Sequence, residues 1–381
     1  MTKRICVWSG KRGGFGALAP TMDAIRSHPD LELQVVVTDQ HLYERFGRTV
    51  DEVESRFPIS AEIDMEQSGD RGEDRARAIG VCLQRSAEVL GKLAPDVLVV
   101  IGDRGEVFAG CIAAHNMGIA IAHIQGGDIS GSLDEPVRHA ITKLAHIHFP
   151  STEESADRIR RLGEDDWRIH VVGDTHIDQI ILGDVTPSPV LAEKYDLVEA
   201  APYVLVLQHS DSSAPGDAGR QMSETVEAIL AIGRRALLVY PCSDQGYEGI
   251  IEVLESVRDR PRISVHRNIP APDFIGLQRG ATCLVGNSSA GLIEAPYFGL
   301  PAINVGDRQM GRERGANVID VPYERKAIAE AIERVIQNLG LREALAAAPA
   351  PFGDGTAYRQ ITAVLADLAI CPMVLNKRMT W

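Results

Sequence analysis

Short apolar segments alternate with longer amphipathic segments along almost the whole chain, and this alternation restricts the possible folds more than any other feature. An apolar run followed by helical periodicity is typical of a strand and its crossover helix, so the pattern predicts parallel sheets with helices on both faces. It is interrupted once, between residues 182 and 202, by a glycine and several prolines around one short expected helix. The expected strands are residues 4–8, 33–38, 97–101, 119–124 and 169–172, then 203–207, 236–240, 263–266, 283–285, 302–305 and 318–321; the expected helices include 17–27, 75–93, 106–116 and 153–162.

The chain length also favours two domains, because 381 residues exceed what one hydrophobic core usually organises. We therefore predict an α/β protein with two Rossmann-like doubly wound domains, residues 1–185 and 186–365. A C-terminal tail, residues 366–381, is expected to pack back on the first domain. Ligands of open α/β sheets bind outside the carboxyl ends of the strands, so we expect a ligand cleft between the domains.

The composition excludes several classes of function. A formal net charge of −14 argues against a general nucleic-acid binder, which needs basic residues to neutralise phosphates. No apolar stretch approaches the ~20 residues that span a bilayer, and the N-terminus lacks the apolar run of a signal peptide, so we expect a cytoplasmic protein without a membrane partner. The six cysteines have neither CxxC nor metal-finger spacing, which predicts a reduced compartment and no metal site.

The segment 123–149 carries the residues most typical of a reaction site. An apolar strand ends at a glycine pair, Asp128 follows, and Asp134 is placed as the N-cap of a helix that contains Arg138. Helical spacing of the apolar residues extends this expected helix to about residue 149. The alternative interpretation is an ordinary capped helix with a solvated basic face.

Two further segments place charge at the end of an expected strand. The first strand is followed by SGKRGGFGAL, whose glycines would let backbone amides approach an anion, with Arg12 adding positive charge. Its spacing matches neither the dinucleotide fingerprint nor the P-loop, so we expect neither NAD nor ATP. The strand 97–101 delivers Asp103 and Arg104 to the sheet edge, either as site residues or simply to close an ion pair.

The second half of the chain offers a separate set of candidates. An expected strand ends near Gly286, and Ser288 and Ser289 then open a helix whose amides suit a diphosphate, unless they form a plain N-cap cluster. Glu294, within an apolar stretch of that helix, needs a polar partner, which ribose hydroxyls would supply. His209 follows the first strand of this half, although a lone histidine is more often structural than catalytic.

Together these segments resemble the hydrolysing UDP-N-acetylglucosamine 2-epimerase family, in its branch that releases free sugars for sialic-acid-type biosynthesis. The resemblance is carried by GDR at 102–104, by HIQGGD and DEPVRHAITKLAHIHF within 123–149, and by GNSSAGLIEAP and GDRQMGR within 286–312. It implies two GT-B-like Rossmann-type domains, a UDP-sugar in the cleft, no cofactor, and a homodimer or homotetramer. The implied reaction is anti elimination of UDP across C1–C2, followed by addition of water with inversion at C2.

The resemblance also implies a role for each matching residue. Asp103 and Asp128 are the first candidates for the catalytic carboxylates, and Glu294 is the acid expected on the ribose. The implied catalytic residues are Asp103, Asp128, Asp134, His209, Gln125 and Arg138. The implied nucleotide-binding residues are Arg12, Arg104, His209, Cys242, Asp244, His266, Gly286, Ser288, Ser289, Glu294 and Arg308.

Three positions depart from the family pattern, in which many relatives have an acid, a glutamate and an asparagine where this chain has Gly14, Gln125 and Cys242. Because an amide does not titrate, Gln125 moves the expected base towards Asp128. The small residues Gly14 and Cys242 favour an alternative substrate, a UDP- or GDP-linked 2,4-diacetamido-2,4,6-trideoxyglucose. A GT-B glycosyltransferase or an inactive sugar-nucleotide-binding protein would also fit these residues.

Overall fold

The computed structural model describes residues 2–198, 201–338 and 340–380, so Met1 and Trp381, the ends of the expected domains, lie outside it. The chain divides into two compact units. Unit 1 comprises Met1–Ile129, Leu133–Leu182 and Phe352–Trp381, and unit 2 comprises Ser130–Ser132 and Gly183–Pro351. In the described part of the chain, no helix has both the length and the apolar character needed to cross a membrane.

Unit 1 is built on a six-stranded sheet with the order β3-β2-β1-β4-β5-β6, in which every strand pair is parallel. The strand order reverses between β1 and β4, and in doubly wound sheets such a switch point opens a crevice at the carboxyl edge. The strands are β1 (Lys3–Ser9), β2 (Leu31–Thr38), β3 (Ala61–Ile63), β4 (Val97–Ile101), β5 (Ala120–Ile124) and β6 (Ile147–Phe149).

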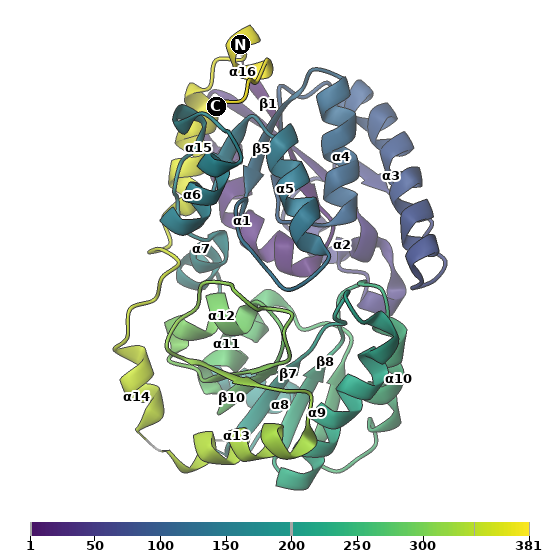
Figure 1. The fold of residues 1–381 in the computed structure, drawn as a ribbon, viewed down its shortest axis with the longest axis vertical. Helices are drawn as coiled ribbons and strands as arrows, with labels where there is room; N and C mark the ends of the chain where they lie inside the picture. Colours follow the sequence, from purple (N-terminus) through teal and green to yellow (C-terminus); the bar gives the residue numbers. More distant parts are fainter. Residues whose placement is uncertain (1, 199–200, 339, 381) are drawn as a thin grey trace. The chain divides into compact units, whose positions relative to one another are not determined.

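Helices cover both faces of this sheet because successive side chains of each strand point to opposite sides. Ile5 and Val7 of β1 join one buried cluster, and Cys6 and Trp8 join another on the opposite face. Figure 1 shows α3, α4 and α5 side by side over the second of these faces. The helices of unit 1 are α1 (Arg12–Ser27), α2 (Val50–Glu54), α3 (Gly72–Leu93), α4 (Gly105–Asn116), α5 (Asp134–Leu144), α6 (Glu153–Arg161), α7 (Thr175–Leu182), α15 (Ala357–Asp367) and α16 (Pro372–Leu375), with short 3₁₀ helices η1 (Asp39–Leu42), η2 (Glu44–Phe46) and η3 (Asp166–Arg168).

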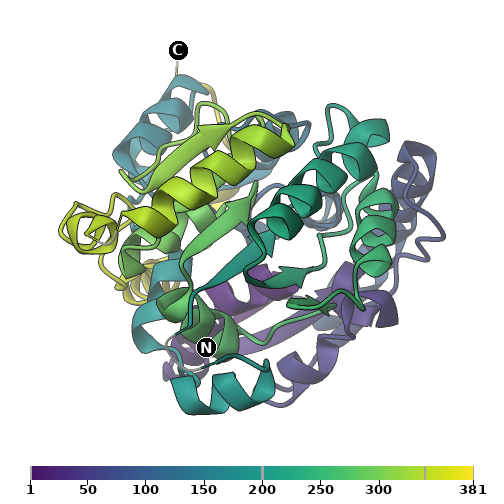
Figure 2. The ribbon, with the colours of Figure 1, turned by 90° about the horizontal axis from the view of Figure 1, so that it is seen from below.

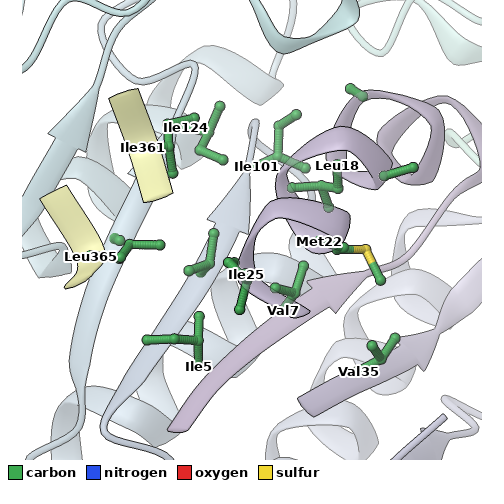
Figure 3. Close-up of a cluster of buried hydrophobic side chains, with 14 of the residues drawn as sticks. Ile5, Val7, Leu18, Met22, Ile25, Val35, Ile101, Ile124, Ile361 and Leu365 are labelled. Atoms are coloured by element: carbon green, nitrogen blue, oxygen red, sulfur yellow. The ribbon is translucent and has the colours of Figure 1, made fainter. Parts of the chain in front are cut away.

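The C-terminal part of the chain completes the core of unit 1. Ile361 and Leu365 of α15 are fully buried and belong to the same hydrophobic cluster as Ile25 of α1 and Ile5 of β1 (Figure 3). We expected residues 352–365 in the second domain and only 366–381 on the first. The structure instead returns the chain at Phe352, because the apolar face of α15 is buried against α1.

Unit 2 repeats the same topology with the strand order β12-β11-β10-β7-β8-β9, again with parallel pairs throughout. Its switch point lies between β7 and β10. Helices α9 and α13 pack against each other over one face, and Figure 2 shows this layer from below. The strands are β7 (Tyr203–Leu207), β8 (Arg235–Val239), β9 (Ile263–His266), β10 (Cys283–Gly286), β11 (Ala302–Val305) and β12 (Val318–Val321); the helices are α8 (Ser188–Lys194), α9 (Ala218–Ile232), α10 (Tyr247–Ser256), α11 (Ala271–Gly280), α12 (Ala290–Ile293), α13 (Arg325–Gln337) and α14 (Leu341–Ala346), with η4 (Pro215–Asp217) and η5 (Ala295–Phe298).

The prediction of two doubly wound α/β domains is confirmed, but one expected strand is not formed. Residues 169–172 make only an isolated parallel bridge, between Ile169 and His148. The pairing does not continue as a ladder because Pro150, on the facing segment, has no N–H to donate. The last strand of the sheet is β6 instead.

Two expected element boundaries also differ. The helix that was extended to residue 149 ends at Leu144, where Ala145 turns to extended backbone before β6. Helix α1 begins at Arg12 rather than at residue 17, so Gly13, Gly14 and Gly16 are helical. Glycine disfavours helix by about 1 kcal/mol relative to alanine, which is why a loop was expected there.

A buried aspartate caps the returning helix from another part of the chain. Asp178 of α7 accepts hydrogen bonds from the backbone N–H groups of Ala357, at 3.0 Å, and Tyr358, at 2.7 Å. Burial raises the pKa of Asp178 to about 7, and Asp174 and Asp354 contribute, against the lowering effect of the two N–H donors. The protonated form is therefore favoured more in the folded than in the unfolded chain.

We expect Asp178→Asn to flatten the stability of unit 1 between pH 5 and pH 8. With a folded pKa of about 7 and an unfolded pKa near the usual value of 3.8, the contribution is complete below about pH 4 and is lost as the pH rises through 7. Trp8 and Trp167, the tryptophans among the described residues, lie in unit 1, so thermal unfolding followed by tryptophan fluorescence reports on this unit. The exposed Asp30→Asn is the matched control, and equal pH slopes for the wild type and Asp178→Asn would contradict the assignment.

Candidate functional site

The candidate residues of unit 1 lie at the carboxyl edge of its sheet, around the switch point. Arg12 follows β1 and begins α1, and Asp103 follows β4. Gly102 has φ +78°, a conformation that favours glycine, and its carbonyl oxygen accepts a 2.7 Å hydrogen bond from Nε2 of His123. Burial lowers the pKa of His123 to about 3, so the ring is a neutral structural donor that holds the turn before Asp103.

Arg138, on α5, is the residue around which three of the candidate carboxylates gather. Its side chain is almost fully buried and forms a short ion pair with Asp103. Its other terminal nitrogen donates to the backbone carbonyl of Asp128 at 2.8 Å. Burial opposes the charge of Arg138, yet the carboxylates of Asp103, Asp128 and Asp134 raise its pKa. The structure therefore places Asp103, Asp128 and Asp134 around one permanent cation.

Asp128 and Asp134 are held in different ways. Asp128 is 7 % exposed, and its Oδ1 accepts a hydrogen bond from Oγ of Ser155 at 2.7 Å. Asp134 is the first residue of α5 rather than its N-cap, because Leu133 already has helical backbone angles. The expectation of a capping side chain is therefore wrong, and Asp134 sits one helical turn before Arg138 instead.

Arg104 is not brought together with Asp103, its neighbour in sequence. It is 5 % exposed and lies 3.8 Å from Asp39 and 3.6 Å from Glu106. Arg75 joins the same cluster, with ion pairs to both carboxylates. Burial and the charge of Asp39 raise the pKa of Glu106, against the effect of the two arginines. Arg104 is thus part of a buried ionic cluster, because two carboxylates of the interior require balancing charge.

Gln125 follows β5 and has φ +63°, in the left-handed region that glutamine rarely adopts. Its Nε2 donates to Oδ2 of Asp174 at 2.8 Å. Asp174 is 1 % exposed and also accepts a hydrogen bond from Oγ of Ser151, at 3.0 Å. The amide of Gln125 is therefore a donor to a buried carboxylate.

In unit 2, a buried asparagine joins the two strands at the switch point. Oδ1 of Asn287 accepts from the backbone N–H of His209 at 2.7 Å, and its Nδ2 donates to the His209 carbonyl at 2.9 Å and to the Tyr323 hydroxyl at 3.2 Å. The backbone carbonyl of Asn287 accepts from Arg308 at 3.2 Å and from Gln309 at 2.9 Å. This residue thus positions His209 and Arg308 together.

The tautomer of His209 follows from its partner. The backbone N–H of Cys242 donates to Nδ1 of His209 at 3.0 Å, so Nδ1 carries no proton. The neutral ring is therefore protonated at Nε2, which is a hydrogen-bond donor and not a base. Cys242 contributes its backbone rather than its thiol to this contact.

The remaining candidates around Asn287 form the edge of β10. Gly286 has φ +133°, and a Cβ there would overlap the carbonyl oxygen of Leu207, so glycine is required for the two strands to approach. Ser288 accepts from the Ala290 amide at 3.3 Å, and Ser289 stands directly before α12. Helix α12 spans only Ala290–Ile293, so Glu294 is its C-cap and not an internal residue of the helix as expected.

Two other candidates have specific polar partners. Asp244 lies 3.5 Å from Arg308, at the carboxyl edge. Glu294, at the end of α12, accepts a 2.8 Å hydrogen bond from Nε2 of Gln278. Gln278 is thus one polar partner of this carboxylate within the protein.

His266, at the end of β9, is not among the contacts of the Asn287 group. Its Nε2 lies 2.7 Å from Oγ of Ser264, and its ring packs edge-on against Tyr195. Burial, with the charges of Arg235, Arg258 and Lys194, lowers the pKa of His266 to about 4. The physical reason for the different position is aromatic packing: the ring covers Tyr195.

Sequence reasoning did not identify Asn287 as the residue that connects the ends of β7 and β10, and it did not identify Asp174 and His176 as candidates. Both of the latter follow the apolar run 169–172, so the rule that polar residues after such runs reach the carboxyl edge would have found them. Within the described residues, no group of three or more His, Cys, Asp or Glu side chains is arranged to hold a metal ion.

We expect Asn287→Ala to loosen the carboxyl edge of unit 2 without unfolding unit 1. The His209 N–H and carbonyl would lose their buried partner, which costs about 1–3 kcal/mol for each unsatisfied group. Hydrogen–deuterium exchange should show the amides around His209 exchanging at least roughly tenfold faster. The exposed Asn116→Ala is the control. Unchanged protection of these amides in Asn287→Ala would show that the hydrogen bonds of Asn287 are not needed to hold this edge.

Comparison with known proteins gives a consistent assignment. Residues 23–366 match the family model described as UDP-N-acetylglucosamine 2-epimerase. A UDP-N,N'-diacetylbacillosamine 2-epimerase (hydrolyzing) of Legionella pneumophila is 33% identical over 99% of both chains. A UDP-N-acetylglucosamine 2-epimerase of Neisseria meningitidis serogroup B is 32% identical, covering 90% of this chain and 89% of that protein.

Solved structures show the same fold. The UDP-GlcNAc 2-epimerase from Neisseria meningitidis bound to UDP-GlcNAc superposes with a TM-score of 0.78 at 21% identity, covering 95% of this chain and 99% of that chain. The family match spans most of the sequence, from residue 23 to residue 366. The chain belongs to the UDP-N-acetylglucosamine 2-epimerase family.

Proposed function

We propose that this protein is a hydrolysing 2-epimerase that converts UDP-N-acetylglucosamine and water to N-acetylmannosamine and UDP, for sialic-acid-type nonulosonate biosynthesis. The observation that carries the proposal is the group of three aspartates around Arg138 at the carboxyl edge of unit 1. Proton transfer at a carbon needs carboxylates of controlled charge, and a fixed buried cation provides that control. A homodimer or homotetramer in the cytoplasm remains part of this proposal.

The proposed chemistry has two stages. In the first, a carboxylate removes the proton at C2 while the C1–O bond breaks and UDP leaves with the bonding electron pair. We propose Asp103 for this role rather than Asp128, towards which Gln125 had moved the expectation, because Asp128 is buried and already accepts a hydrogen bond from Ser155. The product is a 2-acetamidoglycal. In the second stage, water adds at C1 and C2 receives a proton on the opposite face, which inverts its configuration.

We propose that the nucleotide is held by the carboxyl edge of unit 2. His209 offers an Nε2–H donor because Cys242 fixes its tautomer, and Arg308 offers a guanidinium held by Asn287 and Asp244. Donors and cations of this kind stabilise the charge that develops on a departing diphosphate. Glu294 suits the ribose hydroxyls, while Arg12 of unit 1 adds a cation for the phosphates.

A second substrate is favoured by two observations. The Legionella relative is named for UDP-N,N'-diacetylbacillosamine, and it aligns with 99% of this chain. A Cβ added to Gly14 would meet its nearest neighbours, Ile101 and Lys11, at 3.6 Å, so the absence of a side chain there is not forced by packing. We therefore propose a UDP- or GDP-linked 2,4-diacetamido-2,4,6-trideoxyglucose as the alternative substrate of the same reaction.

The decisive experiment follows the purified protein with each UDP-sugar in deuterated water by NMR. Elimination and hydrolysis together predict UDP and a free 2-epimerised sugar that carries deuterium at C2, without any added acceptor. The sugar with the higher kcat/KM is then assigned as the substrate. UDP binding without turnover of either sugar would leave a binding protein or an acceptor-dependent glycosyltransferase and would refute the proposal.

We expect Asp103→Asn to lower UDP release by about 10²–10⁴-fold, because an amide cannot accept the C2 proton. The affinity for UDP alone should stay within about twofold of the wild type, since we place UDP on unit 2. The measurements are coupled detection of UDP and calorimetric titration. Asp23→Asn, which changes a partly exposed aspartate of unit 1, controls for a general loss of charge.

A further inference from the structure

A carboxylate–imidazole pair lies beside Gln125 at the carboxyl ends of β5 and β6. Oδ1 of Asp174 lies 2.8 Å from Nδ1 of His176 and accepts the His176 backbone N–H at 2.9 Å. Oδ2 of the same carboxylate accepts from Gln125 and Ser151. All four residues belong to unit 1, and β5 is the direct neighbour of β4, which delivers Asp103.

The contacts determine where the His176 ring carries its proton. Nδ1 lies 2.8 Å from Oδ1 of Asp174 and 3.1 Å from Nε2 of Gln125. An ionised carboxylate only accepts hydrogen bonds and is the nearer neighbour, so we assign the proton to Nδ1, with the Gln125 amide donating to Asp174 rather than to the ring. In the neutral ring the basic nitrogen is then Nε2. This tautomer is opposite to that of His209, whose Nδ1 accepts from a backbone N–H. The histidine of unit 1 is thus arranged as a base and the histidine of unit 2 as a donor.

Gln125 supports this arrangement at a conformational cost. Its φ of +63° is of the kind that costs on the order of 1 kcal/mol or more for a residue with a side chain. In this conformation its Nε2 reaches Asp174 at 2.8 Å. A glutamate at this position would bring a second carboxylate to the same distance, and the two like charges would repel each other. The amide of Gln125 instead offers the Asp174 carboxylate a hydrogen-bond donor without a charge.

The side chain of His176 has both a fixed orientation and access to solvent. Asp174 is 1 % exposed, whereas the His176 side chain is 20 % exposed. A base that is oriented by a buried carboxylate is the arrangement by which water or a hydroxyl group is deprotonated in hydrolytic sites. The carboxylate also stabilises the imidazolium that forms when the ring takes up a proton.

We propose that His176, oriented by Asp174 and Gln125, is the general base of the hydration stage, and that it takes a proton from the water that attacks C1 of the glycal. This inference rests on the proposed function. The water oxygen bonds to C1, the C1–C2 double-bond electrons take a proton at C2 from a carboxylic acid of the aspartate group, and one water proton moves to Nε2 of His176. The imidazolium then returns that proton to solvent, so the step needs no further reactant.

The first test separates the two stages of the reaction. In His176→Asn, UDP release should persist while free-sugar formation falls by about 10²-fold or more, and the 2-acetamidoglycal should accumulate in the NMR spectrum. His115→Asn, an exposed histidine of α4, is the matched control and should behave as the wild type. If the wild type itself releases no UDP from either sugar, the proposed function fails before the variants are compared.

The second test does not depend on activity. Long-range ¹H–¹⁵N spectra of histidine-labelled protein should show His176 protonated at Nδ1 in the wild type. Asp174→Asn keeps an acceptor for the His176 backbone N–H, so the chain should fold with a near-wild-type melting temperature. In that variant the ring should change tautomer, and free-sugar formation should fall by about tenfold or more while UDP release is less affected.

Three results would overturn the assignment. One is free-sugar formation at the wild-type rate in His176→Asn. Another is an equal loss of UDP release and hydration in that variant, which would place the residue in elimination or in folding. The third is a wild-type ring protonated at Nε2 instead of Nδ1. Accumulation of glycal in both variants, with the Nδ1 proton observed, would support it.

Discussion

Arg138 is a buried cation whose charge is balanced by aspartates from three different positions along the chain, and the carboxyl edge of unit 1 depends on this balance. Asp103 comes from the turn after β4, Asp128 from the loop after β5, and Asp134 from the first turn of the same helix as Arg138. Removing one partner of a buried ion pair typically costs about 3–5 kcal/mol, so the loops are held in place by the charge they share.

In unit 2 the carboxyl edge is connected by the hydrogen bonds of a neutral residue, Asn287. Asn287 uses both ends of its amide and its backbone carbonyl to connect β7, β10 and the loop that carries Arg308. Asn287 holds the Arg308 guanidinium through a neutral backbone carbonyl, and Asp244 lies 3.5 Å from the same guanidinium. The contrast between the units fits the division of labour that we propose, with proton transfer in one and diphosphate binding in the other.

The fold was largely predictable because its strands are continuous apolar runs bounded by turn residues, as in β4 and β7. The errors occurred where two signals overlap. The apolar residues between 141 and 149 have helical spacing, but the segment contains the end of α5, a turn and the strand β6. In α1, the glycines weaken the helical pattern of the sequence. Neither case can be resolved without the tertiary contacts that bury these segments.

The positions of the candidate residues at the edges of the sheets were predictable, but their contacts were not. Polar residues after apolar strands identified Asp103 and His209, because all strands of a parallel sheet point the same way. The sequence does not show that Arg104 turns away to Asp39, or that Gln125 meets Asp174, because these partners are far apart along the chain. Electrostatic balance and hydrogen-bond geometry decide such pairings, and both arise only after folding.

The return of the chain at Phe352 makes the larger part of unit 2 a long insertion within unit 1. Its ends are tied together inside unit 1, since the Asp174 N–H donates to the Phe352 carbonyl at 2.8 Å and Asp178 caps α15. During synthesis, unit 2 is therefore translated before the helix that closes one face of unit 1 exists. A nascent chain that stops before α15 exposes Ile25 and its neighbours, so quality control by chaperones should act on the half that was made first.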